Sequence, residues 1–249
     1  MADVDEQPLE GGNASAEVVR VGSTVRKPWL ASTPAVNDYA GHLLAVGIDL
    51  PRPLGRDDKA RQILEYVDGA LAQTLPRFGS DELQRVGGLV RSIHDASASY
   101  RALDDAAWDV LLPSDGADLI CHNDLAPWNL IVGERWVFID WDAAGPSTRL
   151  WDLAYATQSF AGLNPDELDG APDRLGAFAA GYGADDTLRE QLPDAMARRA
   201  RASFESLRDA HARGEEPWAT MFLSGHGDYW RSVADFLSTY ASSWRAALR

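Results

Sequence analysis

The sequence predicts an α+β fold, with a small β-rich N-terminal lobe and a larger, mainly helical C-terminal lobe. Short apolar runs separated by turns mark the first part of the chain, whereas segments with a helical period mark most of the remainder. We expect residues 1–67 to form the N-terminal lobe and residues 68–249 the C-terminal lobe. A chain of 249 residues that is 45% hydrophobic and 24% charged can bury a full core as an ordinary folded protein.

The N-terminal part begins with strands and turns. Residues 17–21 and 24–28 flank a Gly-Ser pair and predict a β-hairpin, and residues 9–15 before it form a glycine-containing turn. Residues 33–46 follow as a predicted helix, because a threonine precedes a proline at its start. A β-like run at residues 61–67, closed by an Asp-Gly pair, predicts a strand that links the two lobes.

The C-terminal part is predicted to be mainly helical. Residues 80–95 open with a serine cap and an acidic first turn, and they carry apolar residues at helical spacing. Residues 145–160 pass from a Gly-Pro turn into a helix, and two amphipathic segments span residues 193–213 and 227–248. His94 is expected to be a partly buried, hydrogen-bonded histidine rather than a metal ligand.

A predicted β-hairpin interrupts these helices. Residues 129–132 and 136–139 are short apolar runs on either side of a Gly-Glu-Arg turn. Antiparallel pairing places Asn129 opposite Ile139, so Asn129 and Asp140 leave the hairpin at the same end. Magnesium takes oxygen ligands, and a carboxylate and an amide oxygen together with nucleotide phosphates make a suitable set. We therefore expect Asn129 and Asp140 to bind one Mg²⁺.

The loop before this hairpin contains further residues that are expected to take part in a reaction. Its pattern His-x-Asp-Leu-x-x-x-Asn, from His122 to Asn129, is close to the catalytic-loop signature of kinases and predicts phosphoryl transfer. Asp124 is expected to take the proton of an acceptor hydroxyl as that oxygen bonds to phosphorus. His122 is expected to hold the loop by hydrogen bonds. The alternative is that Asp124 only faces water, as most aspartates do, but a loop between two apolar runs favours a functional site.

A bound nucleotide needs a cation for its phosphates and partners for its base. Lys27 is the expected cation, and Arg26 is its rival because strand alternation sends only one of them inward. Backbone N–H and C=O groups at Glu65 and Val67 are expected to hydrogen-bond an adenine edge. The glycine turn would let backbone N–H groups approach phosphate oxygens, although such a turn alone fits a plain surface hairpin equally well.

Charge and composition restrict the partners. The net charge of −15 argues against nucleic acid, whose phosphates are held by Lys and Arg clusters. The single cysteine, Cys121, excludes a disulfide framework and a multi-cysteine zinc site, and its apolar surroundings predict a buried, inert thiol. Apolar runs are too short to span a membrane and the N-terminus is acidic, so we expect a cytoplasmic protein with no membrane partner.

The acidic balance also suits a cationic acceptor, although acidic surfaces commonly serve solubility alone. Acidic and aromatic residues of the C-terminal helices could bind amines by charge and sugar faces by stacking. The alternative is a solvated helix face with ordinary core aromatics. The candidate acceptor-binding residues are Asp209, Glu215, Glu216, Asp228 and Trp230.

From the glycine turn to its end, the chain resembles the aminoglycoside phosphotransferase family of small-molecule kinases, most specifically over residues 121–132 and 138–152. The resemblance implies a two-lobed protein-kinase-like fold, ATP or GTP as donor, Mg²⁺, and transfer of the terminal phosphoryl group to a hydroxyl of a small molecule. By position it implies these roles: Asp124 as catalytic base, Asn129 and Asp140 as metal ligands, Lys27 as the phosphate-binding lysine, Asp142 as a nearby acidic helper and Asp152 as a structural aspartate.

The chain departs from the protein-kinase pattern in two places. The Asp-Trp-Asp sequence at residues 140–142 lacks a glycine, and only eleven residues separate Asp140 from Asp152, too few for a long regulatory segment. A protein substrate is therefore not expected. The predicted helix 33–46 contains no glutamate to pair with Lys27, so either Asp38 or Asn37 substitutes or the lysine is held in another way.

Three functions follow from these residues. The leading one is a kinase that phosphorylates an aminoglycoside or related antibiotic and so confers antibiotic resistance. The second is a metabolic kinase for an amino alcohol, a sugar or a fructosamine-like acceptor. The third is a catalytically silent binding protein that confers immunity by sequestering its ligand. Asp124, Asn129 and Asp140 are all present, which argues against the third.

Overall fold

The computed structural model describes residues 6–9 and 18–249. The predicted glycine turn at residues 9–15 therefore lies, apart from Leu9, outside the described residues. The N-terminal part is a five-stranded antiparallel sheet with the strand order β1-β2-β3-β5-β4. Its strands are β1 (Gln7–Pro8), β2 (Val19–Val21), β3 (Thr24–Lys27), β4 (Pro53–Arg56) and β5 (Gln62–Glu65).

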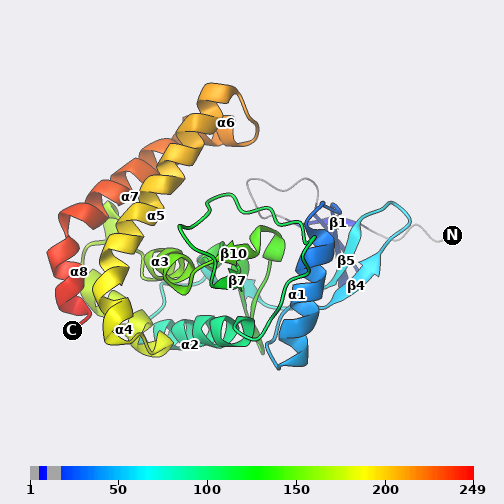
Figure 1. Ribbon diagram of the computed structural model, residues 1–249, viewed down its shortest axis with the longest axis horizontal. Helices are drawn as coiled ribbons and strands as arrows, with labels where there is room; N and C mark the ends of the chain where they lie inside the picture. Colours follow the sequence, from blue (N-terminus) through cyan, green and yellow to red (C-terminus); the bar gives the residue numbers. More distant parts are fainter. Residues whose placement is uncertain (1–5, 10–17) are drawn as a thin grey trace.

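The predicted first helix is present as α1 (Thr33–Ala45) and joins the sheet to the rest of the protein. Pro34 lies in its first turn, where the missing N–H costs no helical hydrogen bond. Tyr39 on its buried face donates its hydroxyl proton to the carbonyl of Ile120 at a distance of 2.9 Å and contacts the hydroxyl of Ser97. This helix therefore packs directly against the elements that carry the predicted catalytic loop (Figure 1).

Two small sheets lie in the C-terminal part. Strand β7 (Leu119–Cys121) pairs with β10 (Gly145–Ser147), and β8 (Leu130–Val132) pairs with both β6 (Ala70–Leu71) and β9 (Trp136–Phe138). The predicted hairpin is thus present, one residue shorter on each strand. Asn129 instead closes the short 3-10 helix η2 (Pro127–Asn129), yet its carbonyl still accepts the N–H of Ile139 at 2.8 Å.

The remainder is helical, as predicted. The helices are α2 (Ser80–Ser97), α3 (Arg149–Phe160), α4 (Ala171–Tyr182), α5 (Asp186–Arg213), α6 (Trp218–Met221), α7 (Gly227–Thr239) and α8 (Ala241–Ala247). Short 3-10 turns lie at η1 (Ala72–Thr74), η3 (Trp141–Ala143) and η4 (Pro165–Glu167), and a π-helical turn, η5 (Phe222–His226), leads into α7. Helices α5 and α7 run side by side and rise from the body as an arm that ends at α6 (Figure 1).

The two predicted helices nearest the C-terminus differ most from the structure. Helix α5 begins at Asp186 rather than at Pro193, because the side chain of Asp185 caps it by accepting the N–H of Leu188 at 2.8 Å. The predicted helix 227–248 is divided at Tyr240 into α7 and α8. This break lets Trp244 enter the core, where its exposed fraction is 0% and its indole N–H donates to the carbonyl of Leu237.

Helix α2 is held in the helical core by the close approach of its backbone to that of α4. A Cβ atom added at Gly87 would lie 2.4 Å from the carbonyl oxygen of Phe178, and one added at Gly181 would lie 2.1 Å from that of Gln84. Only glycine therefore allows α2 and α4 to cross this closely. Within the part of the chain that the structure describes, no helix has both the length and the apolar character needed to cross a membrane.

Candidate active site

The predicted catalytic loop leaves β7 and is held by buried hydrogen bonds. His122 is fully buried, its Nδ1 accepts the N–H of Asp124 at 3.2 Å, and its Nε2 lies 3.0 Å from the carbonyl oxygen of Ile139. A neutral imidazole protonated on Nε2 satisfies both contacts. His122 thus ties the loop to the end of β9, where Asp140 follows.

Asn123 adopts the left-handed conformation, with φ of 64°, which asparagine tolerates better than most side chains. Its N–H donates to Oδ1 of Asp152 at 2.9 Å, and its side-chain amide lies 3.1 Å from the carbonyl oxygen of Ala143. The loop is therefore fastened to α3 and to η3. Asp152, which the resemblance implies to be a structural aspartate, thus contacts the backbone of the loop.

Asp152 is held in turn by α2 and α4. Its Oδ2 lies 3.0 Å from Nε2 of His94, whose Nδ1 lies 2.8 Å from the hydroxyl of Tyr182. Both side chains of the His94–Asp152 pair have an exposed fraction of 0%, so His94 is fully rather than partly buried. Three helices thereby fix the backbone that carries Asp124.

Asp124 and Asn129 lie in contact at the start of the hairpin. The side-chain amide of Asn129 donates to Oδ2 of Asp124 at 2.8 Å and to its backbone carbonyl at 2.9 Å. Burial raises the pKa of Asp124, and nearby Asp140 adds to the rise. The amide nitrogen of Asn129 is engaged by Asp124, so its Oδ1 is the atom left to face a cation.

Lys27 reaches the same place from β3. Its exposed fraction is 6%, and its ammonium lies 2.7 Å from Oδ1 of Asp140 and 2.7 Å from Oδ2 of Asp142. Burial opposes the charged form of Lys27, but the two carboxylates outweigh it and raise the pKa of the lysine. Arg26 points to a different partner, since its Nε lies 3.6 Å from Asp57.

The carboxyls beside Lys27 respond differently to their surroundings. Burial opposes ionisation of Asp140, yet the Lys27 ammonium holds the pKa of Asp140 below its ordinary value. Burial raises the pKa of Asp142, to which the neighbouring charge of Asp140 contributes. The residues present fit a divalent cation, because the side-chain oxygens of Asn129 and Asp140 are hard donors at one end of the hairpin.

Helix α1 does not hold Lys27. Asp38 instead accepts the hydroxyl proton of Tyr100 at 2.7 Å, and His42 contacts the hydroxyl of Ser99 at 3.1 Å. The sequence leaves two alternatives open, a partner for Lys27 from this helix or a lysine held in another way. The structure agrees with the second, because the ammonium of Lys27 pairs with Asp140 and Asp142.

The strand that is predicted to bind adenine ends at Glu65, and part of its backbone is already hydrogen-bonded within the protein. The N–H of Glu65 donates to the carbonyl of Arg52 at 2.9 Å, and its carboxylate lies 2.6 Å from Nη1 of Arg135. The N–H of Glu65 is therefore not available to a base, which corrects that part of the prediction. Val67 is buried against Ile131.

The predicted acceptor residues have two kinds of partner. All four carboxylates lie on the arm and contact partners close in the sequence: Asp209 contacts Arg208, Glu215 contacts Arg213, Glu216 contacts Thr220, and Asp228 contacts Arg231. Trp230 differs, because its ring stacks on that of Tyr155 with centroids 6.0 Å apart. Tyr155 in turn interacts with Asp124, so Trp230 belongs to the surroundings of the predicted base.

Two residues near Asp124 escaped the sequence analysis. Tyr155 lies on α3 and is buried. Arg199 of α5 has an exposed fraction of 6%, and its guanidinium carbon lies 4.5 Å from the centre of the Tyr155 ring. Burial lowers the pKa of Arg199. The helical spacing of the sequence carried a signal for Arg199, because this charged residue falls on the buried stripe of α5 that includes Met196 and Ser203.

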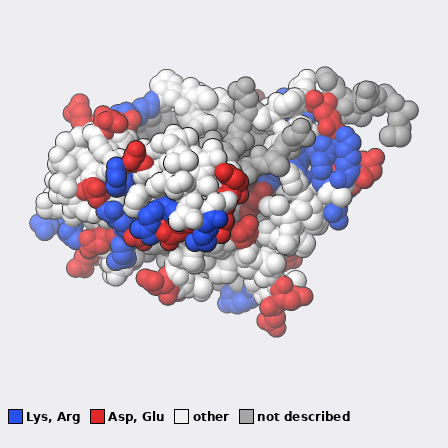
Figure 2. Space-filling model, turned by 90° about the horizontal axis from the view of Figure 1, so that it is seen from above, with Lys and Arg blue, Asp and Glu red and all other residues white. Residues whose placement is uncertain are grey.

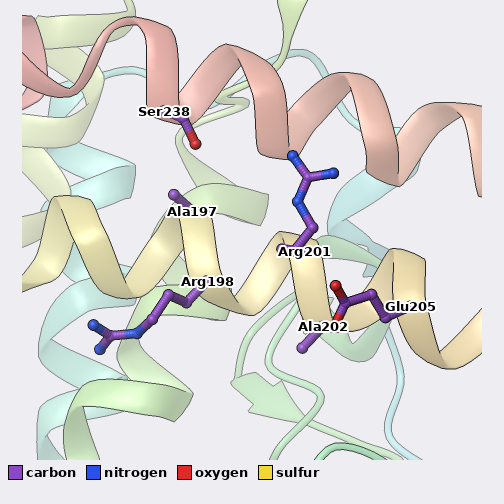
Figure 3. Close-up of a pocket in the computed structure, with 6 residues that line it drawn as sticks. All are labelled: Ala197, Arg198, Arg201, Ala202, Glu205 and Ser238. Atoms are coloured by element: carbon purple, nitrogen blue, oxygen red, sulfur yellow. The ribbon is translucent and has the colours of Figure 1, made fainter.

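A shallow groove of about 370 Å³ lies on another face of α5, against α7 (Figure 3). Its lining residues are Ala197, Arg198, Arg201, Ala202, Glu205 and Ser238. These α5 positions alternate with the buried stripe that carries Arg199. The groove is therefore separate from the surroundings of Asp124 and is no part of the candidate active site.

Charges of the N-terminal lobe are arranged around its sheet. Lys and Arg side chains gather at this end of the molecule with acidic groups beside them (Figure 2). Glu6 contacts both Lys59 and Arg61 at 2.8 Å, and Arg61 lies 2.9 Å from Asp57. These ion pairs join β1 to the β4–β5 hairpin.

Comparison with known proteins identifies the family. The phosphotransferase enzyme family (APH) matches residues 69–197, more than half of the chain, and the chain belongs to this family. It is a phosphotransferase with a hydroxyl acceptor, and the predicted small-molecule kinase with its protein-kinase-like fold is confirmed. No curated protein sequence matches the chain.

Solved structures share the fold at low sequence identity. A choline/ethanolamine kinase family protein from Mesorhizobium loti has a TM-score of 0.64 and 15% identity, with 100% of this chain and 94% of that chain covered. Amicoumacin kinase hAmiN, solved with AMP-PNP, Ca²⁺ and Ami, has a TM-score of 0.68 and 15% identity over 92% and 88% of the two chains. An aminoglycoside phosphotransferase from Alicyclobacillus acidocaldarius has a TM-score of 0.60 and 16% identity over 99% and 93%.

Proposed function

We propose that this protein transfers the terminal phosphoryl group of ATP or GTP to a hydroxyl of an aminoglycoside or related antibiotic. The observation that carries the proposal is the convergence of Asp124, Asn129, Asp140 and Lys27 at one end of the catalytic hairpin. The similarity to an amicoumacin kinase and to an aminoglycoside phosphotransferase supports an antibiotic as acceptor.

In the proposed reaction, Asp124 accepts a hydrogen bond from the acceptor hydroxyl. The hydroxyl oxygen forms a bond to the terminal phosphorus as the bond between that phosphorus and the bridging oxygen breaks, and the proton passes to the Asp124 carboxylate. Asn129 and Asp140 would hold Mg²⁺, which would neutralise phosphate charge. Lys27 supplies a further positive charge to the phosphates, and the nucleoside diphosphate leaves.

The nucleotide base is proposed to lie at the end of β5. The N–H of Glu65 is engaged within the sheet, so the proposal rests on its carbonyl and on the backbone groups of Val67. These groups follow the five-stranded sheet and precede β6. This position agrees with a lobe boundary at residues 67 and 68, which we also propose.

On the acceptor side, we propose that Trp230 and Tyr155 form one wall of the site. Their stacked rings lie beside Asp124, where a sugar face or an amine can pack. The arm carboxylates are satisfied by neighbouring residues, so we assign them a weaker role as an acidic surface that attracts a cationic acceptor.

A metabolic kinase for an amino alcohol is the second candidate. It is favoured by similarity to the choline/ethanolamine kinase family protein and to a microcompartment-associated aminopropanol kinase, which has a TM-score of 0.67 and 13% identity over 99% of this chain and 94% of that chain. The same hairpin residues would serve this reaction without change.

The test is an acceptor panel with Mg²⁺ and ATP, in which ADP formation and phosphate esters are followed by phosphorus NMR. Aminoglycosides and other hydroxyl-bearing antibiotics form one arm, and choline, ethanolamine and aminopropanol form the other. We expect transfer to the antibiotics by the wild type and none by Asp140→Ala. Transfer confined to the amino alcohols would select the second candidate, and binding of a panel compound without any transfer would favour a silent binding protein.

A further inference from the structure

Lys27 is held from the opposite lobe. Its ammonium lies 2.7 Å from each of two carboxylates, Asp140 and Asp142, which belong to the segment after β9 rather than to α1. Asp142 lies in η3, and Trp141 between the two aspartates is buried and donates its indole N–H to the carbonyl of Phe138 at 2.9 Å. The position of the Asp142 carboxylate is therefore fixed by the hairpin itself.

Asp142 also faces a second residue of the N-terminal sheet. Gln62 of β5 is the register partner of Lys27 on β3, so both side chains lie on one face of that sheet. Gln62 has an exposed fraction of 2%, and its side chain interacts with Asp142 as well. Two neighbouring strands thus present a cation and an amide to one carboxylate.

Helix α1 offers no substitute for this carboxylate. Asp38 is its one acidic residue, and it is engaged by the hydroxyl of Tyr100 at 2.7 Å. A lysine that must meet phosphate oxygens needs a fixed anion beside it, because its flexible stem otherwise allows many positions. In this chain that anion has to come from the hairpin.

Under the proposed function, on which this inference rests, the two hairpin aspartates have different roles. Asp140 is the proposed metal ligand, and an oxygen bound to a divalent cation attracts an ammonium less strongly. Asp142 then remains to hold the lysine, and one of the three ammonium N–H groups suffices for that contact. The other two are free to meet phosphate oxygens.

We propose that Asp142 is a positioning residue for Lys27, holding the ammonium at the phosphate site from the catalytic hairpin. Asp142, in the C-terminal lobe, thus holds the lysine in place of an acidic residue of α1. Nucleotide affinity then depends on Asp142 through Lys27, and acceptor affinity does not depend on it.

The test measures nucleotide binding by calorimetry, without acceptor, for wild type, Asp142→Asn, Lys27→Met and the double variant, with Asp38→Asn as the matched control on α1. We expect Asp142→Asn to weaken ATP binding about tenfold and Asp38→Asn to change it less than about twofold. The double variant should bind ATP no more weakly than Lys27→Met alone, because residues that act as a unit are not additive.

Repeating the titrations over a range of Mg²⁺ concentrations separates a lysine partner from a metal ligand. The loss in Asp142→Asn should persist at saturating Mg²⁺ and should be smaller without Mg²⁺, because Asp140 then still holds the ammonium of Lys27. Recovery at high Mg²⁺, additive losses in the double variant, or wild-type binding by Asp142→Asn would overturn the inference. If Asp142→Asn does not fold, Asp142→Glu, which keeps the carboxylate, should retain nucleotide binding above that of Lys27→Met.

The wild type separates this inference from the proposed function. A wild-type protein that binds no nucleotide contradicts the proposed function, and the inference falls with it. A wild-type protein that binds ATP while Asp142→Asn binds equally well contradicts the inference alone.

Discussion

The carboxylates at the junction of the lobes differ from those on the arm in how far they are exposed to solvent. At the junction, the side chains of Lys27 and Asp142 are 8% and 28% exposed. On the arm, the side chains of Glu215 and Asp228 are 51% and 82% exposed. Exposed ion pairs contribute about 0–1 kcal/mol, whereas removing one partner of a buried group leaves the other without compensation.

The two regions also differ in how their partners are related along the chain. Lys27 and Asp140 are 113 positions apart, whereas Arg231 pairs with Asp228 three positions earlier. A local pair forms on any helix that presents both residues, but a distant pair exists only when the fold is complete. Charge at the junction is therefore evidence of a site, and charge on the arm describes a surface.

The largest effect is expected from Asp152→Ala, which removes the anchor of the catalytic loop. The N–H of Asn123 and the ring of His94 would lose a buried partner, so unfolding free energy should fall by about 3 kcal/mol. Urea denaturation of the variant and the wild type measures this difference. A loss below about 1 kcal/mol would show that the buried network is no stronger than an exposed ion pair.

A smaller effect is expected from Trp230→Ala, which tests the arm residue that stacks on Tyr155. Loss of the ring stacked on Tyr155 should raise the KM for the acceptor about tenfold and leave the KM for ATP unchanged. Steady-state kinetics with each substrate varied in turn separates the two values. An equal rise in both would indicate a general structural role instead.

The pH dependence of activity tests whether Asp124 is buried as the structure has it. Burial raises its pKa, and only the ionised carboxylate can accept the hydroxyl proton. Activity should therefore fall on acidification through a pH above the ordinary value for aspartate, about 4. The profile of kcat/KM against pH shows this limb, and a midpoint at or below the ordinary value would contradict it.

The smallest effect is expected from the arm charges. Glu215→Gln and Asp228→Asn each remove an exposed local ion pair, so the midpoint of thermal unfolding should stay within about 2 °C of that of the wild type. Thermal unfolding of each variant provides the measurement. A larger fall in this midpoint would remove the distinction between the two regions.

The sequence predicted features that depend on nearby residues. Asn129 and Ile139 pair as hairpin spacing requires, and Asp152 meets the loop from the first turn of α3. The start of α5 was misplaced because Pro193, inside that helix, has the appearance of a first-turn proline. This local rule fails here because a stronger cap, Asp185, lies further upstream.

Contacts between distant elements could not be predicted in the same way. Strand alternation predicts that only one of Lys27 and Arg26 points inward, but the partners of Lys27 depend on how the two lobes meet. Tyr155 and Arg199 come together only because α3 packs against α5. Spacing along the chain carries no information about such packing.

The most direct test of the account is the kcat of Asp124→Asn with an acceptor identified in the panel. The variant keeps the shape of the side chain and removes the proton acceptor, so kcat should fall by about 100-fold or more while ATP binding measured by calorimetry stays within about twofold of wild type. Glu215→Gln, the exposed control, should keep wild-type kcat. An Asp124→Asn protein with kcat within a few-fold of wild type would contradict the assignment of the chemistry to this hairpin.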